Sequence, residues 1–243
     1  MRRGRRRQIW RRQRSAPARL SYLQAVISHE QRCIFVHIPK TGGTSIEDVI
    51  WGSDHAARTP DMLWMGGKDP HYQHWVRGFG GLQHMRAEQV REIVGAQTYD
   101  SYYSFAFVRN PWDRAVSQYL YARQYEEMRQ VYQFDEDTSF PGYLRVLLDG
   151  KRERNCHSFE QWRFIFGPDG NQLTDFVGRF ESLQTDFAAV AHKIGTTIEL
   201  PHTNRSADRG QLCEYYGDDG VARDMVEALY GEDIRRFGYS FPG

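Results

Sequence analysis

The feature that most restricts the fold of this chain is an apolar run that ends in a loop of one lysine, two glycines and three hydroxyls. Residues 33–38 read CIFVHI, and residues 39–45 read PKTGGTS. Such a run is typical of a strand buried in a parallel sheet. The spacing of Ile46, Val49 and Ile50 predicts a helix after the loop. Because loop N–H groups and a helix N-terminus bind anions together, the sequence predicts a strand–loop–helix unit that holds a phosphate or sulfate.

A second unit of the same kind begins near residue 102. Residues 102–108, YYSFAFV, predict another buried strand, and Pro111 suits the first turn of a helix. Arg109 lies at the end of this strand, and Ser117 lies about two helical turns into the following helix. Because neighbouring parallel strands end at one edge of a sheet, both should converge on the ligand of the first loop. Two anion sites on adjacent units suit a nucleotide with phosphates at both ends.

The rest of the chain predicts further helices around this sheet. Apolar spacing predicts helices at residues 86–94, 183–194 and 221–237, and the unpatterned residues 51–81 predict a long loop. Residues 162–166 and 176–180 are predicted to pair as a hairpin across the turn at 167–171. Length and apolar content suit one domain, which we expect to cover residues 31–243.

Residues 1–30 differ in composition from this body. The first 19 residues hold nine arginines and no acidic residue, whereas the remainder holds 23 basic and 31 acidic residues. The basic start could bind nucleic acid or an anionic membrane, be a solvated tail, or be sequence upstream of the true start codon. We expect a flexible tail without a specific nucleic-acid partner, leading into a short helix at 20–27. Without a secretory signal or an 18-residue apolar run, a cytoplasmic protein with no transmembrane segment is expected.

Two classes of site are disfavoured by the sequence. The three cysteines are far apart and form no CxxC pair, so they indicate neither a disulfide framework nor a zinc site. In the Walker pattern the lysine follows the glycines, whereas Lys40 precedes Gly42 and Gly43. No acidic strand of the Walker B kind is evident for magnesium. A divergent P-loop kinase and a nucleotide- or nucleic-acid-binding protein without transferase activity are kept as alternatives to the interpretation that follows.

Two segments resemble the cofactor-binding signatures of the sulfotransferase superfamily: FVHIPKTGGTS at 35–45 and FAFVRNPWDRAVSQY at 105–119. The resemblance is to the branch with carbohydrate 2-O- and 4-O-sulfotransferases and bacterial relatives, and it covers about residues 31–241. It implies an α/β fold of the P-loop-like, three-layer kind, with a central, mainly parallel sheet flanked by helices. It also implies transfer of a sulfuryl group from 3′-phosphoadenosine 5′-phosphosulfate (PAPS) to an acceptor hydroxyl, which leaves adenosine 3′,5′-bisphosphate. The implied acceptor is a carbohydrate or a glycosylated small molecule.

The resemblance assigns residues to each end of the donor. Arg109 and Ser117 correspond to the 3′-phosphate site, although Arg109 could instead pair with Asp113, and Arg205 is expected to close over the adenine or 3′-phosphate. Lys40 is also predicted to be catalytic, because a cation beside the departing phosphate stabilises the transition state more than the ground state. No metal is expected to be required, since the loop supplies the positive charge. The predicted 5′-phosphosulfate loop consists of Lys40, Thr41, Gly42, Gly43, Thr44 and Ser45.

The acceptor hydroxyl must also lose a proton, which suits a base whose pKa lies near neutrality. In the related enzymes this base lies between the two signatures, where four histidines stand in this chain. We predict His84, just before the helix at 86–94, to be the catalytic base. His71, His74 and Glu47 are the alternatives. His37 is expected to be a core or strand-end histidine with its hydrogen bonds satisfied. The four histidines between the signatures are His55, His71, His74 and His84.

Overall fold

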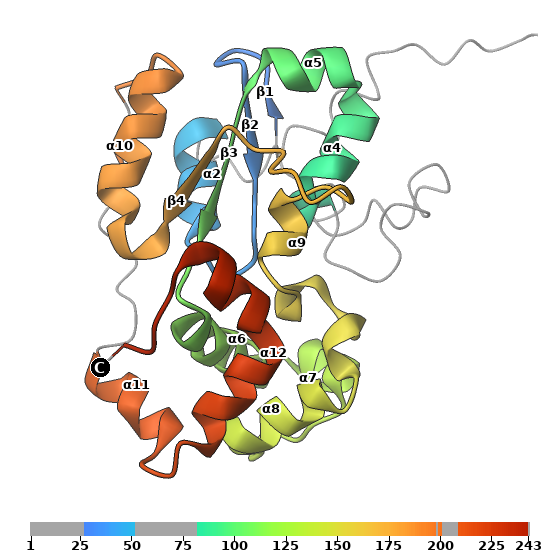
Figure 1. Ribbon diagram of the computed structural model, residues 1–243, viewed down its shortest axis with the longest axis vertical. Coiled ribbons are helices and arrows are strands. Elements are labelled where there is room, and N and C mark those ends of the chain that lie inside the picture. Colours follow the sequence, from blue (N-terminus) through green and yellow to red (C-terminus); the bar gives the residue numbers. More distant parts are fainter. Residues whose placement is uncertain (1–26, 52–81, 198, 201–208, 243) are drawn as a thin grey trace, which may run out of the picture.

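The structure is a computed structural model, and it describes residues 27–51, 82–197, 199–200 and 209–242 (Figure 1). Its centre is a four-stranded sheet in the order β1 (Ile27–Ser28), β2 (Cys33–Val36), β3 (Tyr103–Val108) and β4 (Phe176–Arg179). β1 runs antiparallel to β2, whereas β2, β3 and β4 are parallel to one another. The predicted α/β class with a mainly parallel sheet is therefore confirmed.

Helices cover both faces of this sheet (Figure 1). On one face Phe35, Phe105 and Phe107 pack against α2 (Gly43–Trp51) and α10 (Leu183–Lys193). On the other face, Ile34 and Val36 pack against α4 (Ala87–Val94), α5 (Ala96–Ser101) and α9 (Trp162–Ile165). Because successive side chains of a strand point to opposite faces, a continuously apolar strand contributes to both cores. The result is the expected three-layer arrangement.

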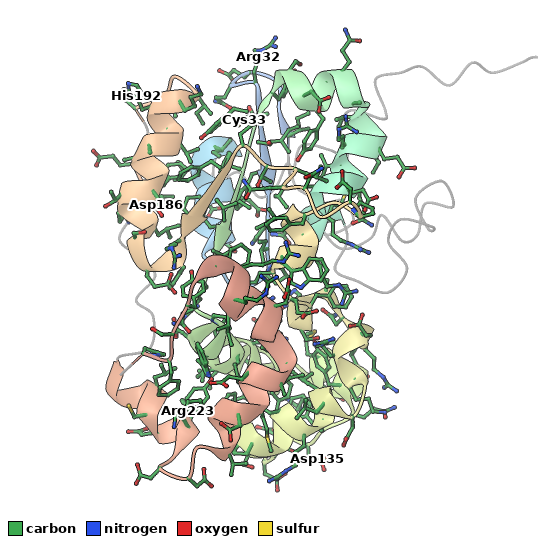
Figure 2. The ribbon with its side chains drawn as sticks, viewed as in Figure 1. Arg32, Cys33, Asp135, Asp186, His192 and Arg223 are labelled. Atoms are coloured by element: carbon green, nitrogen blue, oxygen red, sulfur yellow. The ribbon has the colours of Figure 1, made fainter. Side chains whose placement is uncertain are left out.

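A second group of helices lies beyond the carboxyl ends of β2 and β3, in the lower half of Figure 1. Its core is rich in buried aromatic side chains, among them Trp112, Tyr132 and Tyr143. In Figure 2, Arg32 and Cys33 mark the opposite, amino end of β2. The strand tips therefore end at the junction between the sheet and this helical group, where the functional residues gather. The group consists of α6 (Pro111–Gln124), α7 (Glu126–Tyr132), α8 (Phe140–Leu148), α11 (Arg209–Tyr216) and α12 (Val221–Phe237).

Helix α6 starts as its sequence predicts. The Asn110 side chain accepts a hydrogen bond from the Trp112 N–H at 3.1 Å, which satisfies one of the free N–H groups of the first turn. Pro111 occupies that turn, where its missing N–H costs nothing. Arg109 is thereby fixed between the tip of β3 and the start of α6.

The predicted hairpin is wrong. Residues 162–165 form the short helix α9, and β4 pairs in parallel with β3 instead. Only an isolated bridge joins Phe166 to Gln172, although the turn between them forms. The buried Asp233 carboxylate accepts the N–H groups of Gln161 and Trp162, both at 2.8 Å. This long-range cap favours a helix at a segment whose local pattern indicates a strand.

Several other predictions fall partly or wholly outside the described residues. Ile27 belongs to β1 rather than to the helix predicted at 20–27, and the rest of that segment is not described. In the described ranges no helix is long and apolar enough to cross a membrane. One domain over 31–243 stays a prediction. Also outside the description are the arginine-rich start, His55, His71, His74 and Arg205.

Candidate active site

The loop after β2 makes a tight turn that its own residues hold in place. Lys40 has φ 69° and Gly42 has φ 83°, both in the left-handed region that favours glycine. The hydroxyl of the fully buried Thr41 donates to the Ile38 carbonyl at 2.8 Å. Because α2 begins at Gly43, its free N–H groups lie at the end of this turn. A non-glycine residue in the left-handed region is a common mark of a functional loop.

The Lys40 ammonium is partly buried in an aromatic setting. Its Nζ lies 4.3 Å from the centre of the Tyr121 ring, a favourable cation–π contact. Among the described residues, no carboxylate forms an ion pair with it. Burial, together with the neighbouring Arg109 and Arg114, lowers the pKa of Lys40 to about 8. A partly buried cation with no carboxylate partner among the described residues is favourably placed to attract an anion.

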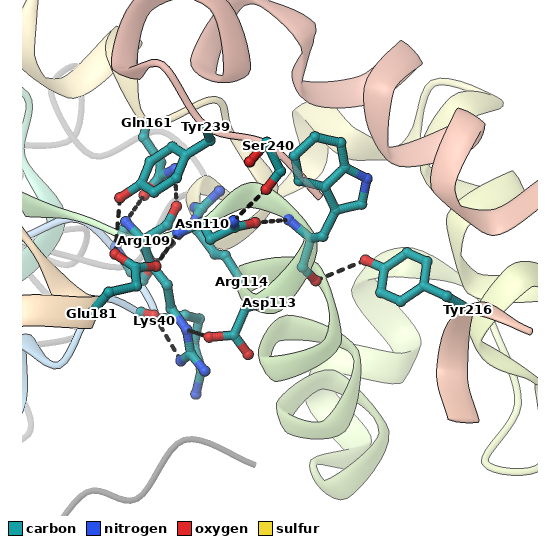
Figure 3. Close-up of polar contacts among 12 residues, drawn as sticks. Lys40, Arg109, Asn110, Asp113, Arg114, Gln161, Glu181, Tyr216, Tyr239 and Ser240 are labelled. Atoms are coloured by element: carbon teal, nitrogen blue, oxygen red, sulfur yellow. Dashed lines mark hydrogen bonds and ion pairs between the residues drawn. The ribbon is translucent and has the colours of Figure 1, made fainter. Parts of the chain in front are cut away.

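Arg109 connects the two units at the strand tips (Figure 3). Its Nε donates to Asp113 at 2.7 Å, and one terminal nitrogen donates to the Lys40 carbonyl at 3.3 Å. Its guanidinium lies 4.2 Å from the centre of the Phe180 ring. The Asp113 pairing is the alternative that the sequence left open. Ser117 is four residues beyond Asp113, so it shares that face of α6.

The backbone of Arg109 is held from the C-terminal helix through Gln161. The Gln161 carboxamide accepts from the Arg109 N–H at 2.8 Å and donates to its carbonyl at 2.9 Å. Asp233 of α12 then accepts the N–H of Gln161 at 2.8 Å, and burial raises the pKa of Asp233 to about 6. This chain of hydrogen bonds fixes the position of Arg109 at the strand tip from a helix more than a hundred residues away.

Arg114 supplies a further buried charge that the sequence analysis missed. Its side chain is fully inside the protein, and its guanidinium donates to the carbonyls of Pro39 at 3.0 Å, Phe159 at 2.9 Å and His157 at 3.1 Å. No carboxylate in the described ranges forms an ion pair with it. An arginine within a helix is usually solvent-exposed, so no sequence signal singles it out.

Three buried histidine rings lie in contact at the same junction. The His84 ring centre is 4.5 Å from that of His37 and 5.0 Å from that of His157. His84 Nδ1 donates to the His37 carbonyl at 3.0 Å, which leaves Nε2 as the nitrogen with a lone pair. Burial is the main cause that lowers the pKa of His84 well below its ordinary value, so the ring is uncharged at neutral pH. His84 is therefore uncharged, as a base must be, although its pKa lies below the near-neutral value expected of the base.

His157 connects the histidine rings to Lys40. It stacks on Tyr121 at 5.1 Å between ring centres, and burial together with Lys40 lowers its pKa to about 3. Sequence reasoning missed both residues. His157 lies outside the interval between the two signatures, where the base was sought, and Tyr121 lies just after the second signature. Lys40, Tyr121, His157 and His84 therefore form a continuous series of contacts from the loop to the predicted base.

His37 and Glu47 form one buried pair. His37 Nδ1 lies 2.7 Å from Oε1 of Glu47, and Gln83 Nε2 donates to Oε2 of Glu47 at 2.8 Å. His37 is, as predicted, a buried strand-end histidine with a hydrogen-bond partner. Both oxygens of Glu47, one of the alternative bases, accept hydrogen bonds from neighbouring side chains.

Gly43 is needed because the His37 ring lies against it. A Cβ added to Gly43 would be 2.1 Å from two atoms of that ring. Gly43→Ala is therefore expected to displace His37 and to lower the free energy of unfolding by about 1–3 kcal/mol in urea denaturation. Gly231→Ala, where an added Cβ meets nothing within 4 Å, is the control and should not destabilise. Equal stability of the two variants would contradict this packing.

Several of the residues predicted for the site lie at one junction. The loop with Lys40, the end of β3 with Arg109, and His84 meet where the sheet adjoins the helical group. Thr44 is exposed, Ser45 is buried and Ser117 is partly buried.

A parallel sheet whose neighbouring strand tips carry a lysine-containing loop and an arginine places positive charge at the edge where α/β proteins commonly bind anionic ligands. The chain belongs to the sulfotransferase family, whose sequence model matches residues 23–240. The predicted superfamily is therefore confirmed.

The chain is also similar to individual proteins. An uncharacterized protein of Archaeoglobus fulgidus is 32% identical over 127 residues, which are 51% of this chain and 94% of that protein. Carbohydrate sulfotransferase 11 of Rattus norvegicus and that of Mus musculus are each 20% identical over 244 residues, which are 89% of this chain and 67% of theirs. No solved structure gives a significant match.

Proposed function

We propose that this sulfotransferase moves a sulfuryl group from PAPS to a hydroxyl of a carbohydrate or a glycosylated small molecule. The observation that carries the proposal is Lys40, a partly buried cation on a left-handed turn without a carboxylate partner among the described residues. The similarity to a protein named carbohydrate sulfotransferase 11 supports the acceptor class.

The residues at the junction fit such a donor. The loop of residues 40–45 and the first N–H groups of α2 offer donors for the 5′-phosphosulfate, and Lys40 offers a positive charge. Arg109 and Ser117 are proposed to hold the 3′-phosphate, with Arg109 sharing its guanidinium between that group and Asp113. Arg205 is proposed to reach the adenine or the 3′-phosphate. When bound, the donor supplies the activated sulfuryl group.

In the proposed reaction His84 Nε2 takes the proton of the acceptor hydroxyl while the acceptor oxygen bonds to sulfur. Lys40 and the loop N–H groups stabilise the electron pair left on the phosphate oxygen when the bond from that oxygen to sulfur breaks. The bound anion would raise the pKa of His84, because an imidazolium is favoured beside negative charge. We propose that the reaction does not require a metal ion. The described residues contain no group of three or more His, Cys, Asp or Glu side chains that could hold one.

The proposal is tested by supplying donor labelled with radioactive sulfur and a panel of carbohydrate acceptors, with and without EDTA. We expect labelled product in both cases, and tighter binding of adenosine 3′,5′-bisphosphate than of ATP with magnesium. Preferred binding of ATP with magnesium would favour the divergent kinase. Bisphosphate binding without transfer to any acceptor, abolished by deletion of residues 1–19, would favour a binding protein.

The variant His84→Asn tests proton removal by His84 separately from binding of the donor. The variant is expected to lower kcat by about 100-fold, while the Kd for adenosine 3′,5′-bisphosphate changes by less than about threefold. His192→Asn, on α10 in the upper part of Figure 2, is the control and should leave both values unchanged. Unchanged kcat in His84→Asn would move the proposed base to His71, His74 or Glu47.

A further inference from the structure

We propose that Glu47 is a positioning residue that fixes the orientation and tautomer of His84 relative to the anion loop. The inference rests on the proposed sulfuryl transfer, in which His84 takes the proton. It differs from the sequence-based alternative, in which Glu47 is itself the base. Three connected observations carry it.

The first observation is that the Glu47 carboxylate is hydrogen-bonded to both residues that fix the position of His84, namely His37 and Gln83. Glu47 is 1% exposed. Its Oε1 lies 2.7 Å from His37 Nδ1, and its Oε2 accepts from Gln83 Nε2 at 2.8 Å. Gln83 is the covalent neighbour of His84 in the 3₁₀ turn Leu82–His84, and the His37 carbonyl is the hydrogen-bond acceptor for His84 Nδ1. Displacement of either partner would therefore displace His84.

The second observation is that the carboxylate belongs to the helix that starts in the anion loop. Glu47 lies in the second turn of α2, which begins at Gly43. The His37 ring lies against Gly43 and also contacts the His84 ring, at 4.5 Å between ring centres. A shift of the loop is thus transmitted through Glu47 and His37 to His84, so the loop and the base keep a fixed relation.

The third observation concerns hydrogen-bond chemistry. His37 and Gln83 both present N–H donors to Glu47, and a carboxylate accepts at both of its oxygens. A glutamine in the same place has one acceptor oxygen, so its NH₂ group would face one of the two donors. A buried donor left without an acceptor is costly, and the local structure would rearrange to avoid it.

The inference is tested with Glu47→Gln and with the exchanged pair Glu47→Gln/Gln83→Glu. We expect Glu47→Gln to lower kcat about 10- to 100-fold, with the Kd for adenosine 3′,5′-bisphosphate changed less than about threefold. The exchanged pair restores an acceptor for each donor and should recover most of kcat. A carboxylate acting directly as the base would not be recovered in this way.

The tautomer of His84, observed by nitrogen NMR of the labelled imidazole, is a readout that does not depend on activity. We expect the Nδ1-protonated form in the wild type and the exchanged pair, and a mixture of tautomers in Glu47→Gln. If Glu47→Gln does not fold, Gln83→Met removes one donor only and should give a partial change in the same direction.

Asp175→Asn is the control for a carboxylate that has a structural role away from the site. Asp175 accepts from the Ser104 N–H at 2.8 Å and from its hydroxyl at 2.9 Å, at the amino end of β3. Its loss should reduce stability without changing the His84 tautomer. A wild-type kcat and tautomer in Glu47→Gln would overturn the inference, as would failure of the exchanged pair to recover activity. If the wild type transfers no sulfuryl group, the proposed function fails, while the tautomer comparison still decides whether Glu47 positions His84.

Discussion

Replacing Lys40 by methionine is expected to lower kcat by about 10²- to 10³-fold without lowering the free energy of unfolding. Methionine keeps much of the length of the side chain but removes the charge that opposes the electron pair left on the phosphate. Stability should be nearly unchanged, because loss of the cation–π contact with Tyr121 is offset by relief of the repulsion from Arg109 and Arg114, and no carboxylate partner in the described ranges is lost. Single-turnover kinetics and urea denaturation measure the two effects separately. A loss of kcat that is accompanied by a large fall in the free energy of unfolding would contradict this role for Lys40.

The same lysine predicts the alkaline side of the pH profile. Lys40 stabilises charge only when protonated, and its pKa in the protein is lowered to about 8. As pH rises through about 8, the ammonium loses its proton and kcat/KM should fall. In kcat the fall should come at higher pH, because a bound anion raises the pKa of the lysine. Lys40→Arg should remove this alkaline fall, since a guanidinium stays charged; an unchanged fall would assign it to another group.

Replacing Arg114 by methionine is expected to reduce the free energy of unfolding by at least about 3 kcal/mol. The guanidinium is the donor for three buried carbonyls, those of Pro39, Phe159 and His157, and methionine leaves all three without it. The variant should also weaken binding of adenosine 3′,5′-bisphosphate, because the Pro39 contact holds the residue before Lys40. Urea denaturation and calorimetric titration provide the two measurements.

Two further variants distinguish the hydrogen bonds of Arg114 from its charge. Arg114→Lys keeps the charge but lacks the planar set of donors, so an intermediate loss of stability is expected. Arg91→Met removes a surface arginine whose ion pair with Asp100 is exposed, and it should leave the urea midpoint nearly unchanged. If Arg114→Met were no worse than Arg91→Met, the three carbonyl contacts would not stabilise the fold.

The parts of the fold that were predictable have strong local signals. The runs at β2 and β3 are apolar without interruption because both faces of a central parallel strand are covered. Asn110 and Pro111 mark the start of α6 by their local chemistry. The segment of α9 was predicted wrongly because its cap comes from Asp233, some seventy residues away, and no local pattern contains that contact.

The same distinction applies to the site. The loop around Lys40 was predictable because its glycines and hydroxyls are contiguous in the sequence. Its left-handed turn agrees with the prediction of a tight loop after the first strand. Arg114, Tyr121 and His157 were missed, since each acquires its role through contacts between distant segments. For Glu47 the sequence suggested an acid–base group, and the structure adds the two hydrogen bonds that occupy its oxygens.

The contact between Lys40 and Tyr121 has a consequence for the energetics of the proposed anion binding. An ammonium in contact with an aromatic ring has already lost part of its hydration shell, and this part of the dehydration occurs during folding rather than at binding. With no carboxylate to displace among the described residues, an arriving anion breaks no ion pair at Lys40. The Tyr121 ring thus occupies the ammonium with a weak, uncharged contact that a bound anion can replace. Affinity at this position then depends on how easily Lys40 leaves the ring as well as on the charge it carries.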